Sequence, residues 1–471
     1  MAADFRALDT ISALRQTGQG TGLMAISAKR LLHGAIWTTG VYFVSVALRF
    51  GSNVILSRLV MPEVFGALLI IGTLRNGIEL ISDVGIGQNI VHNSKGEELR
   101  FRDTAWTIQL IRGFLLSSLM FVLAAPLGQL YSLPSSAIQL SAVVLLLGGG
   151  TSVSIYMLQR QLQFVKLNLF DLMVEFVNVG LVIALALYSP TIWSLLAANI
   201  LAMGVRTLAS YFLPYGRAWF AWQASYAREI MSFGKWIFLS SLLSFLCASF
   251  DKLYLGHAVP LAVLGVYGIA RTIADLPSVL VGRLSHSLIF PVVSSRRGQE
   301  MGVLRAEMRP LRLRLLLAFA ACIGFVVSVS DFAVWLVYDP RYQDAGWILP
   351  VLLLGVWCSL LCTISEYSLL GLGRPVYGAA GNMTKLLFMV VAIPLGLQFY
   401  GIAGAVLMIT ASELCRYFPI LIGQYRERIA FFRQDVATTA LLVLFILMFS
   451  FVRYEAGYGT AFDGALEAFR S

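Results

Sequence analysis

Long apolar stretches separated by short polar breaks cover most of this 471-residue chain. A helix needs about 20 mostly apolar residues to cross the hydrocarbon core of a bilayer. Several breaks are only a few residues long, as at "YSPT" (188–191), so successive spans are expected to run antiparallel. The pattern predicts thirteen membrane-spanning helices, at residues 34–57, 63–83, 104–131, 137–158, 168–188, 191–213, 235–256, 261–285, 313–338, 346–370, 376–399, 401–423 and 436–453.

The composition agrees with a polytopic membrane protein and excludes a soluble globular one. Hydrophobic residues make up 58 % of the chain and charged residues 13 %, whereas a soluble domain has about 45–50 % and about 25 %. The first 30 residues lack the apolar core and cleavage site of a signal peptide. All five cysteines fall inside apolar segments, and no Walker A sequence occurs. We therefore expect no disulfide framework, no metal site, no ATP hydrolysis and no cofactor.

Basic residues predict the orientation of the helices. If the N-terminus is cytoplasmic, the outer loops and tail hold only Arg58, Arg341, Arg453 and Arg470, and all other loop Lys and Arg residues lie inside. This bias follows the positive-inside rule. The net charge of +10 is then explained by a cytoplasmic face that lies against anionic lipid, and no nucleic-acid partner is predicted.

The two halves of the chain resemble each other when one is shifted by 199 residues. "MPEVFGALLIIGTL" (61–74) then falls on "PLAVLGVYGIARTI" (260–273), with Val64–Gly66 over Val263–Gly265. Repeats with an even number of spans have the same orientation, and transporters of this plan bind substrate between the repeats near the midplane. We therefore predict an all-α polytopic membrane protein with two pseudo-symmetric six-helix lobes around a central cavity, plus one extra C-terminal transmembrane helix.

The predicted domain boundaries follow from the repeat. They are a cytoplasmic N-terminal tail (1–33), an N-lobe with spans one to six (34–215), a cytoplasmic interlobe linker (216–235), a C-lobe with spans seven to twelve (236–425), and an additional C-terminal span and tail (426–471).

Two stretches carry a resemblance to a known family. "LSRLVMPEVFGALLIIGTL" (56–74) resembles the start of polysaccharide transporters of the multidrug/oligosaccharidyl-lipid/polysaccharide exporter superfamily, which carry an "xRxLxPxxFG" turn between spans one and two. "DVGIGQNIV" (83–91) is similar to the stretch that ends their second span. The resemblance to these Wzx-like proteins implies a flippase in the bacterial inner membrane. Its implied substrate is an undecaprenyl-pyrophosphate-linked oligosaccharide for exopolysaccharide, capsule or O-antigen synthesis.

Charged residues recur on one face of two predicted spans. In "LRNGIELISDVGIG" (74–87), Arg75, Glu79 and Asp83 are spaced by four residues, and Arg271 and Asp275 repeat this spacing on span eight. Each charge costs about 2.5–3.5 kcal/mol at the centre of a lipid-facing helix. These side chains are therefore expected to face a shared lumen, or to form internal ion pairs that hold helices together, or both.

A guanidinium group can hold two phosphate oxygens at once, which suits it to a pyrophosphate. Arg49 has no acid four residues away and is the first choice for this contact. Arg112, Arg206 and Arg283 are equally compatible with anchoring at lipid headgroups. The predicted substrate-binding residues, for pyrophosphate or headgroup, are Arg49, Arg75, Lys252, Arg271, Lys385 and Arg416, and their predicted polar partners in the lumen are Asn53, Asn76, Glu79 and Asp275.

Asp171 and Glu175 share a face of span five with no basic residue in reach except Lys166, or Arg206 from another span. They are candidates for binding a coupling proton or Na⁺, and the alternative is an interlobe or loop-facing pair.

Three other functions were weighed against the flippase. A drug/cation antiporter and a peptidoglycan-precursor flippase belong to the same superfamily and stay open as alternatives. A glycan polymerase or ligase needs a large outer loop with catalytic residues, and the predicted outer loops are short, so we expect no enzyme. The expected partners are the lipid-linked oligosaccharide, membrane lipids, and the polysaccharide polymerase and export machinery. The protein itself is expected to be a monomer.

Overall fold

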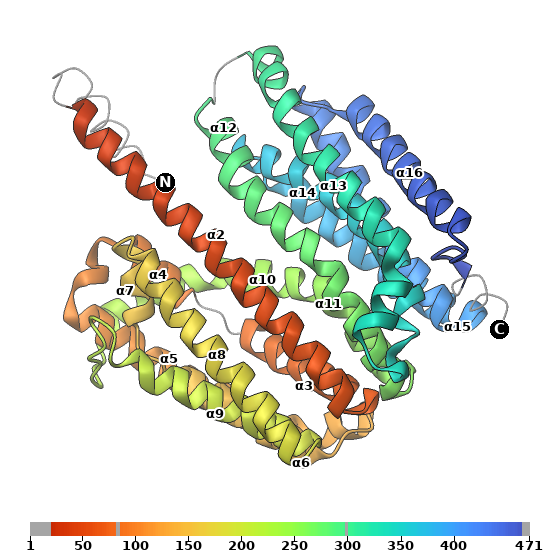
Figure 1. Cartoon of the computed structure of the whole chain (residues 1–471). Coiled ribbons are helices and arrows are strands. Elements are labelled where there is room, and N and C mark those ends of the chain that lie inside the picture. The colour runs from red at the N-terminus through yellow and green to blue at the C-terminus, as the bar shows by residue number, and fades with distance from the viewer. Residues whose placement is uncertain (1–19, 82–84, 297–299, 464–471) are drawn as a thin grey trace.

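The computed structural model describes residues 20–81, 85–296 and 300–463, without the side chains of residues 20–39, 81 and 232–240. Within these ranges the chain is helical throughout, with turns and short loops between the helices (Figure 1). Residues 1–19 of the predicted tail, and Asp83 of the predicted polar stripe, lie outside the described residues.

The first half of the chain, here called the N-half, forms the helices of the predicted spans one to six. They are α2 (Gly20–Leu59), α3 (Pro62–Ile81), α4 (Ile86–His92), η1 (Ser94–Glu97), α5 (Leu99–Leu130), α6 (Ser135–Gly149), α7 (Ser154–Arg160), α8 (Phe164–Tyr188) and α9 (Ile192–Ser210).

The second half, here called the C-half, forms the remaining helices. They are α10 (Ala224–Ala258), α11 (Leu261–Leu284), the π-helical turn η2 (Ser285–Ile289), α12 (Phe290–Ser294), α13 (Met301–Val337), η3 (Pro340–Tyr342), α14 (Ala345–Gly371), α15 (Val376–Arg426) and α16 (Phe432–Glu455).

Nine helices in the described residues are long and apolar enough to cross a membrane, or ten if the bent pair α6 and α7 is one span. The nine do not include α3 and α10, which carry Arg75 and Glu79, and Asp251 and Lys252, within their apolar sequence. The nine do include α15 as one helix, although it contains two of the predicted spans. The protein is therefore an all-helical multi-pass membrane protein.

The long helix α15 is broken in the middle. It has 51 residues, which would extend about 75 Å if straight, more than twice the thickness of a bilayer core. Tyr400 and Gly401 have non-helical backbone angles, and Gly401 has a φ of 57° that glycine adopts without strain. Gly396 and Gly404 then touch, since a Cβ on Gly404 would lie 2.1 Å from the Gly396 carbonyl oxygen. The predicted break at Gly401 is therefore confirmed.

Some predicted spans differ from the helices that contain them. The helix of span one begins at Gly20, so it extends beyond the predicted apolar segment at 34–57. The single predicted span 137–158 is two helices, α6 and α7, that meet at an angle of 52°. The predicted interlobe linker 216–235 is helical from Ala224 onward, where α10 begins.

In Figure 1, α5, α8 and α9 lie on one side of the molecule and α13, α14 and α16 on the other, with α2 drawn between the two groups. Within the N-half, α2 packs on α8, and α5 packs on α6. Within the C-half, α14 packs on α11, α13 and α15. The halves join where α3 packs on α11 and α10, and α10 in turn packs on α15. Helices of both halves therefore meet at this junction, beside the charged residues of α3, α10, α11 and α15.

The last helix, α16, is attached to α13 at both ends by ion pairs. Arg312 of α13 is fully buried and pairs with Asp435 in the first turn of α16. Tyr417 Oη also donates to Asp435 Oδ2, at 2.6 Å. At the other end, Arg453 Nη1 and Nη2 donate to both carboxylate oxygens of Asp331, at 2.5 and 2.6 Å. Bidentate pairs of this kind fix geometry as well as energy, so α16 is a fixed part of the C-half.

The substitution Asp435→Ala is expected to destabilise the protein by about 3–5 kcal/mol, because it leaves the Arg312 guanidinium buried without a counter-charge. Thermal unfolding in detergent measures the effect. Asp331→Ala is the matched control, since its carboxylate is one-third exposed and its loss should cost clearly less. The double variant Arg312→Leu with Asp435→Leu should regain most of the stability. Equal losses in the two single variants would contradict the assignment.

Candidate functional site

A network of charged side chains lies inside the C-half, on α10, α11, α14 and α15. Its members are Asp251, Arg271, Asp275, Glu366, Lys385, Glu413 and Arg416. We call these seven residues the C-half network.

The α11 side of the network is built around Arg271. Its Nε lies 3.2 Å from Asp275 Oδ1, one helical turn away, and 3.9 Å from Asp251 Oδ2 on α10. Asp251 is only 2 % exposed, and Tyr267 Oη donates a hydrogen bond to it at 2.5 Å. The predicted Arg271–Asp275 pair is therefore present, and a second carboxylate holds the same guanidinium from the neighbouring helix.

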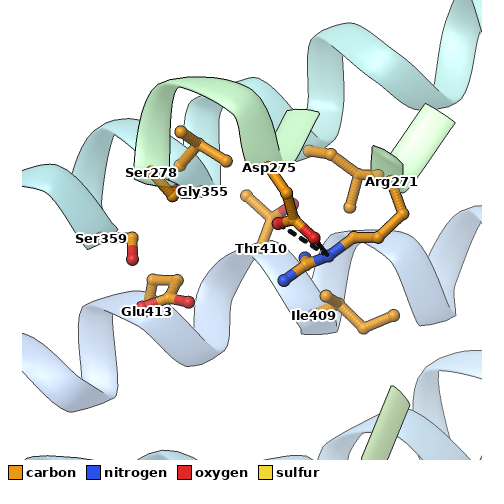
Figure 2. Close-up of a pocket in the computed structure, with 10 residues that line it drawn as sticks. Arg271, Asp275, Ser278, Gly355, Ser359, Ile409, Thr410 and Glu413 are labelled. Carbon is orange, nitrogen blue, oxygen red and sulfur yellow. Dashed lines mark hydrogen bonds and ion pairs between the residues drawn. The ribbon is translucent and has the colours of Figure 1, made fainter. Parts of the chain in front are cut away.

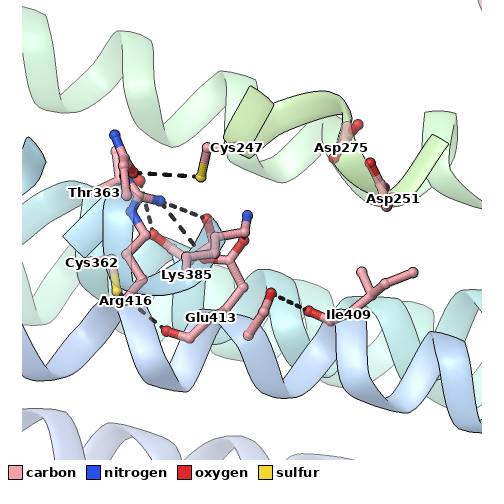
Figure 3. A network of polar contacts seen from close by, with 12 residues as sticks. Cys247, Asp251, Asp275, Cys362, Thr363, Lys385, Ile409, Glu413 and Arg416 are labelled. Atoms are coloured by element: carbon pink, nitrogen blue, oxygen red, sulfur yellow. Dashed lines mark hydrogen bonds and ion pairs between the residues drawn. The ribbon is translucent and has the colours of Figure 1, made fainter. Parts of the chain in front are cut away.

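The α15 side of the network joins the two parts of the broken helix (Figure 3). Lys385 Nζ lies 2.5 Å from Glu413 Oε1, with both side chains about nine-tenths buried. Arg416 Nη2 lies 2.6 Å from Glu366 Oε2 of α14, and its Nη1 lies 3.7 Å from Glu413 Oε2. Burying this many charges is tolerable only because each is paired, and the pairs hold α14 and both parts of α15 together.

A small pocket with a volume of about 20 Å³ opens between α11, α14 and α15 (Figure 2). The Arg271–Asp275 pair lies on one side, and Glu413 and Ser359 lie across from it. Ser278 and Thr410 add hydroxyl groups to the wall. Glu413 Oε2 is buried and makes no hydrogen bond to another described residue. The pocket thus offers a carboxylate oxygen and hydroxyls beside a guanidinium, which suits a small polar group or water.

Two ion pairs connect predicted spans of the N-half. Arg49 Nε and Nη2 donate to the two oxygens of Glu175 on α8, at 2.8 and 2.6 Å. Arg206 Nη1 of α9 lies 2.9 Å from Asp171 Oδ1. Arg49 has no acid four residues away on its own helix and is paired with Glu175 of α8, because helical spacing within one span cannot detect a carboxylate on another helix. Asp171 and Glu175 are likewise paired with bases from neighbouring helices.

Two predicted cations make no ion pair with any described residue. Arg75 on α3 and Lys252 on α10 are both half-buried, and neither has a carboxylate within 4 Å among the described residues. The predicted Arg75–Glu79 pair is absent in this conformation. Arg112 instead donates to the Glu79 carbonyl oxygen at 2.5 Å.

The remaining predicted residues are distributed around these groups. Asn53 is half-buried on α2, and Asn76 and Glu79 are exposed on α3. The guanidinium of Arg283 lies 3.7 Å from the centre of the Tyr42 ring, so this side chain contacts α2. In the described part of the chain, no three His, Cys, Asp or Glu side chains are grouped to hold a metal ion.

The sequence analysis missed Tyr267 and Ser359, which contact the network. Tyr267 lies one turn before Arg271 on the same face of α11, so the four-residue spacing that identified Asp275 also pointed to it. Ser359 has no such signal, because its position depends on how α14 packs against α15.

Comparison with known proteins places the chain in a family. A sequence profile of the family described as "Polysaccharide biosynthesis protein" matches residues 55–346, more than half of the chain. The chain belongs to this family. It is therefore a member of a family of membrane transporters and not an enzyme, as the sequence predicted.

Two curated relatives give the same picture. The lipopolysaccharide biosynthesis protein WzxC of Escherichia coli K12 is 21 % identical over 85 % of this chain and 84 % of its own length. The succinoglycan biosynthesis transport protein ExoT of Rhizobium meliloti is 25 % identical over 67 % of this chain. The match covers 62 % of ExoT, less than two thirds of that protein.

Solved structures show the fold. The chain superposes on the lipid II flippase MurJ in an inward closed conformation with a TM-score of 0.71, covering 92 % of this chain and 95 % of MurJ. The two sequences are only 12 % identical, so the likeness concerns the fold alone. The chain therefore has a MurJ-like fold.

Exchanging the two charges of the Arg49–Glu175 pair separates its structural role from a substrate role. The variant Arg49→Glu with Glu175→Arg keeps the attraction between α2 and α8, whereas Arg49→Glu alone creates a repulsion. If the pair is structural, the amount of protein in the membrane and its thermal stability should fall in the single variant and recover in the double variant.

Transport of the polysaccharide unit is the second measurement on these variants. If Arg49 also contacts an anionic substrate, the double variant should be stable and still inactive. A stable double variant with full export would contradict the predicted role of Arg49 in binding.

Proposed function

We propose that the protein is a flippase for an undecaprenyl-pyrophosphate-linked oligosaccharide repeat unit. It moves this unit from the inner to the outer leaflet of the bacterial inner membrane, for the synthesis of exopolysaccharide, capsule or O-antigen. Family membership and the relatives WzxC and ExoT support a role in polysaccharide transport. The polymerase and export machinery would receive the unit after it has crossed.

Arg75 carries the proposal for the substrate contact. It is a half-buried guanidinium on α3, at the junction of the two halves, with no carboxylate within 4 Å among the described residues. Lys252 on the adjoining helix α10 is also half-buried and has no carboxylate within 4 Å among the described residues, although Asp251 precedes it in the chain. A half-buried cation that no carboxylate contacts directly is costly in a membrane, and a pyrophosphate would lower this cost. The other predicted cations, Arg49, Arg271, Lys385 and Arg416, must exchange a carboxylate partner before they can bind it.

Alternating access between two pseudo-symmetric lobes of six spans each would move the headgroup past these residues. The proposed arrangement has thirteen spans in all, a cytoplasmic N-terminus and a central cavity between the lobes. The membrane potential can supply energy, since moving one charge through 100 mV is worth about 2.3 kcal/mol. The inside is negative, so an anionic headgroup is driven outward. Asp171 and Glu175 would bind a coupling proton or Na⁺ only in a state in which their arginine partners have moved away.

The substitution Arg75→Ala is expected to lower the rate of repeat-unit export about 10- to 100-fold, because a hydrogen bond to a charged group contributes about 1.5–3 kcal/mol. Lys252→Ala should have a smaller effect of the same sign. Export is measured as surface polysaccharide in the source bacterium with this gene deleted and each variant supplied in its place. Arg433→Ala is the control, since this arginine is exposed at the start of α16, outside the apolar spans.

Full export by the Arg75→Ala variant at normal membrane level would overturn the pyrophosphate contact. The same chain, expressed in a strain that lacks its own lipid II flippase, tests the peptidoglycan alternative. Growth of that strain would favour a peptidoglycan precursor as the substrate, and binding of organic cations to the purified protein would favour a drug antiporter.

A further inference from the structure

The helices α3 and α11 cross where the repeat places equivalent residues. A Cβ on Gly66 would lie 2.0 Å from the Leu261 carbonyl oxygen, and a Cβ on Gly265 would lie 2.0 Å from the Pro62 carbonyl oxygen. Gly66 and Gly265 are 199 positions apart, as are Pro62 and Leu261. A reciprocal contact between equivalent residues arises where a two-fold axis passes through an interface. The crossing therefore marks the pseudo-symmetry axis between the halves.

The contact continues one turn further along both helices. A Cβ on Gly268 would lie 2.9 Å from Leu69 Cδ2, and these residues are again 199 positions apart. With glycine on both sides, backbone meets backbone at the first contact, and a leucine fills the space at the second. No polar glycan or pyrophosphate can pass between helices that are this close.

A loop of the C-half covers the same end of the crossing. The loop between α13 and α14 contains η3, and Tyr342 in it is fully buried against the N-half. Tyr342 Oη donates to the Val60 carbonyl oxygen at 2.8 Å, and its ring packs edge-on against Phe65 with centroids 5.6 Å apart. Phe65 precedes Gly66 in α3, so the loop and the glycine crossing form one continuous contact between the halves.

Arg341 adds a second attachment from the same loop. Its Nη2 donates to the Arg58 carbonyl oxygen at 3.2 Å, and its Nε donates to Asp339 Oδ1 at 2.7 Å. The hydrogen bond from Arg341 lowers the pKa of Asp339, so this carboxylate stays charged and holds the arginine in place.

We propose that the Gly66–Gly265 crossing and Tyr342 together form a gate that closes the transport path at the end of the α2–α3 and α10–α11 turns. The proposal rests on transport by alternating access between the two halves. A path that opens at this end must separate α3 from α11, and the separation breaks both the glycine contact and the Tyr342 hydrogen bond. In the orientation expected from the basic residues this end faces outward, so the gate is the exit for the flipped headgroup.

The substitutions Gly66→Ala and Gly265→Ala test whether close contact keeps the gate shut. Alanine has a higher helix propensity than glycine. If the gate no longer closes in these variants, the cause is therefore the added methyl group and not a weakened helix. Gly72→Ala on α3 and Gly282→Ala on α11 are the matched controls, since a Cβ at either position meets no atom within 4 Å. All variants are made in the full chain with the five native cysteines replaced.

Access through the gate is measured as the labelling rate of a reporter cysteine, Thr73→Cys. This residue lies two turns beyond Gly66 on the same face of α3. A membrane-impermeant maleimide is added from the side on which Arg58→Cys is labelled, since Arg58 is exposed beside the α2–α3 turn. We expect labelling at least tenfold faster with Gly66→Ala or Gly265→Ala, a shift of about 1.4 kcal/mol, and no change in the controls. Equal rates in all variants would overturn the gate.

Tyr342→Phe is the milder variant, because it removes one hydroxyl and keeps the ring. Loss of this one hydrogen bond should raise the labelling rate of Thr73→Cys about two- to tenfold. Unchanged labelling in this variant would remove Tyr342 from the gate.

Joining the halves should stop the cycle with the gate closed. Phe65→Cys and Tyr342→Cys are combined and treated with a short bifunctional methanethiosulfonate, with each single variant as a control. Export should stop in the linked double variant and return on reduction, whereas continued export by linked protein would show that the contact is permanent packing. Labelling and linking require no substrate, so they test the gate even if the transported molecule is a different one.

Discussion

The cost of placing charge in hydrocarbon governs this structure. A helix that carries Arg271 and Asp275, or Lys385, can remain in a membrane only if another helix supplies the opposite charge or a polar environment. The described pairs do this mostly between helices, as with Arg49 on α2 and Glu175 on α8, or Arg416 on α15 and Glu366 on α14. The positions of the helices and of the charges are therefore set together, and a cation such as Arg75, which forms no ion pair within 4 Å among the described residues, is informative.

The fold class and most of the spans could be predicted from the sequence because apolar length and loop length are local properties. The turn at Gly401 was predicted correctly for the same reason. The division of one expected span into α6 and α7 was not, since a bend within an apolar segment leaves no change in hydropathy. The helical extension of α2 before residue 34 also carries no apolar signal.

The candidate site could be predicted only in part. Residues at four-residue spacing on one helix, such as Arg271 and Asp275, were correctly paired, because helical geometry fixes their separation. The same rule predicted Arg75–Glu79, which the structure does not form, since the rotamer of a long side chain follows its surroundings and not its spacing. Pairs between helices, such as Arg49 with Glu175, depend on tertiary packing and could not be predicted from one sequence.

The fifth and sixth predicted spans of each half are joined by an ion pair, but the signs are reversed. In the N-half the acid Asp171 is on the fifth span and the base Arg206 on the sixth, whereas in the C-half Lys385 is on the fifth and Glu413 on the sixth. The attraction between two unit charges is unchanged when they trade places. Each pair can therefore hold its two spans together equally well, although the acid and the base lie on opposite spans in the two halves.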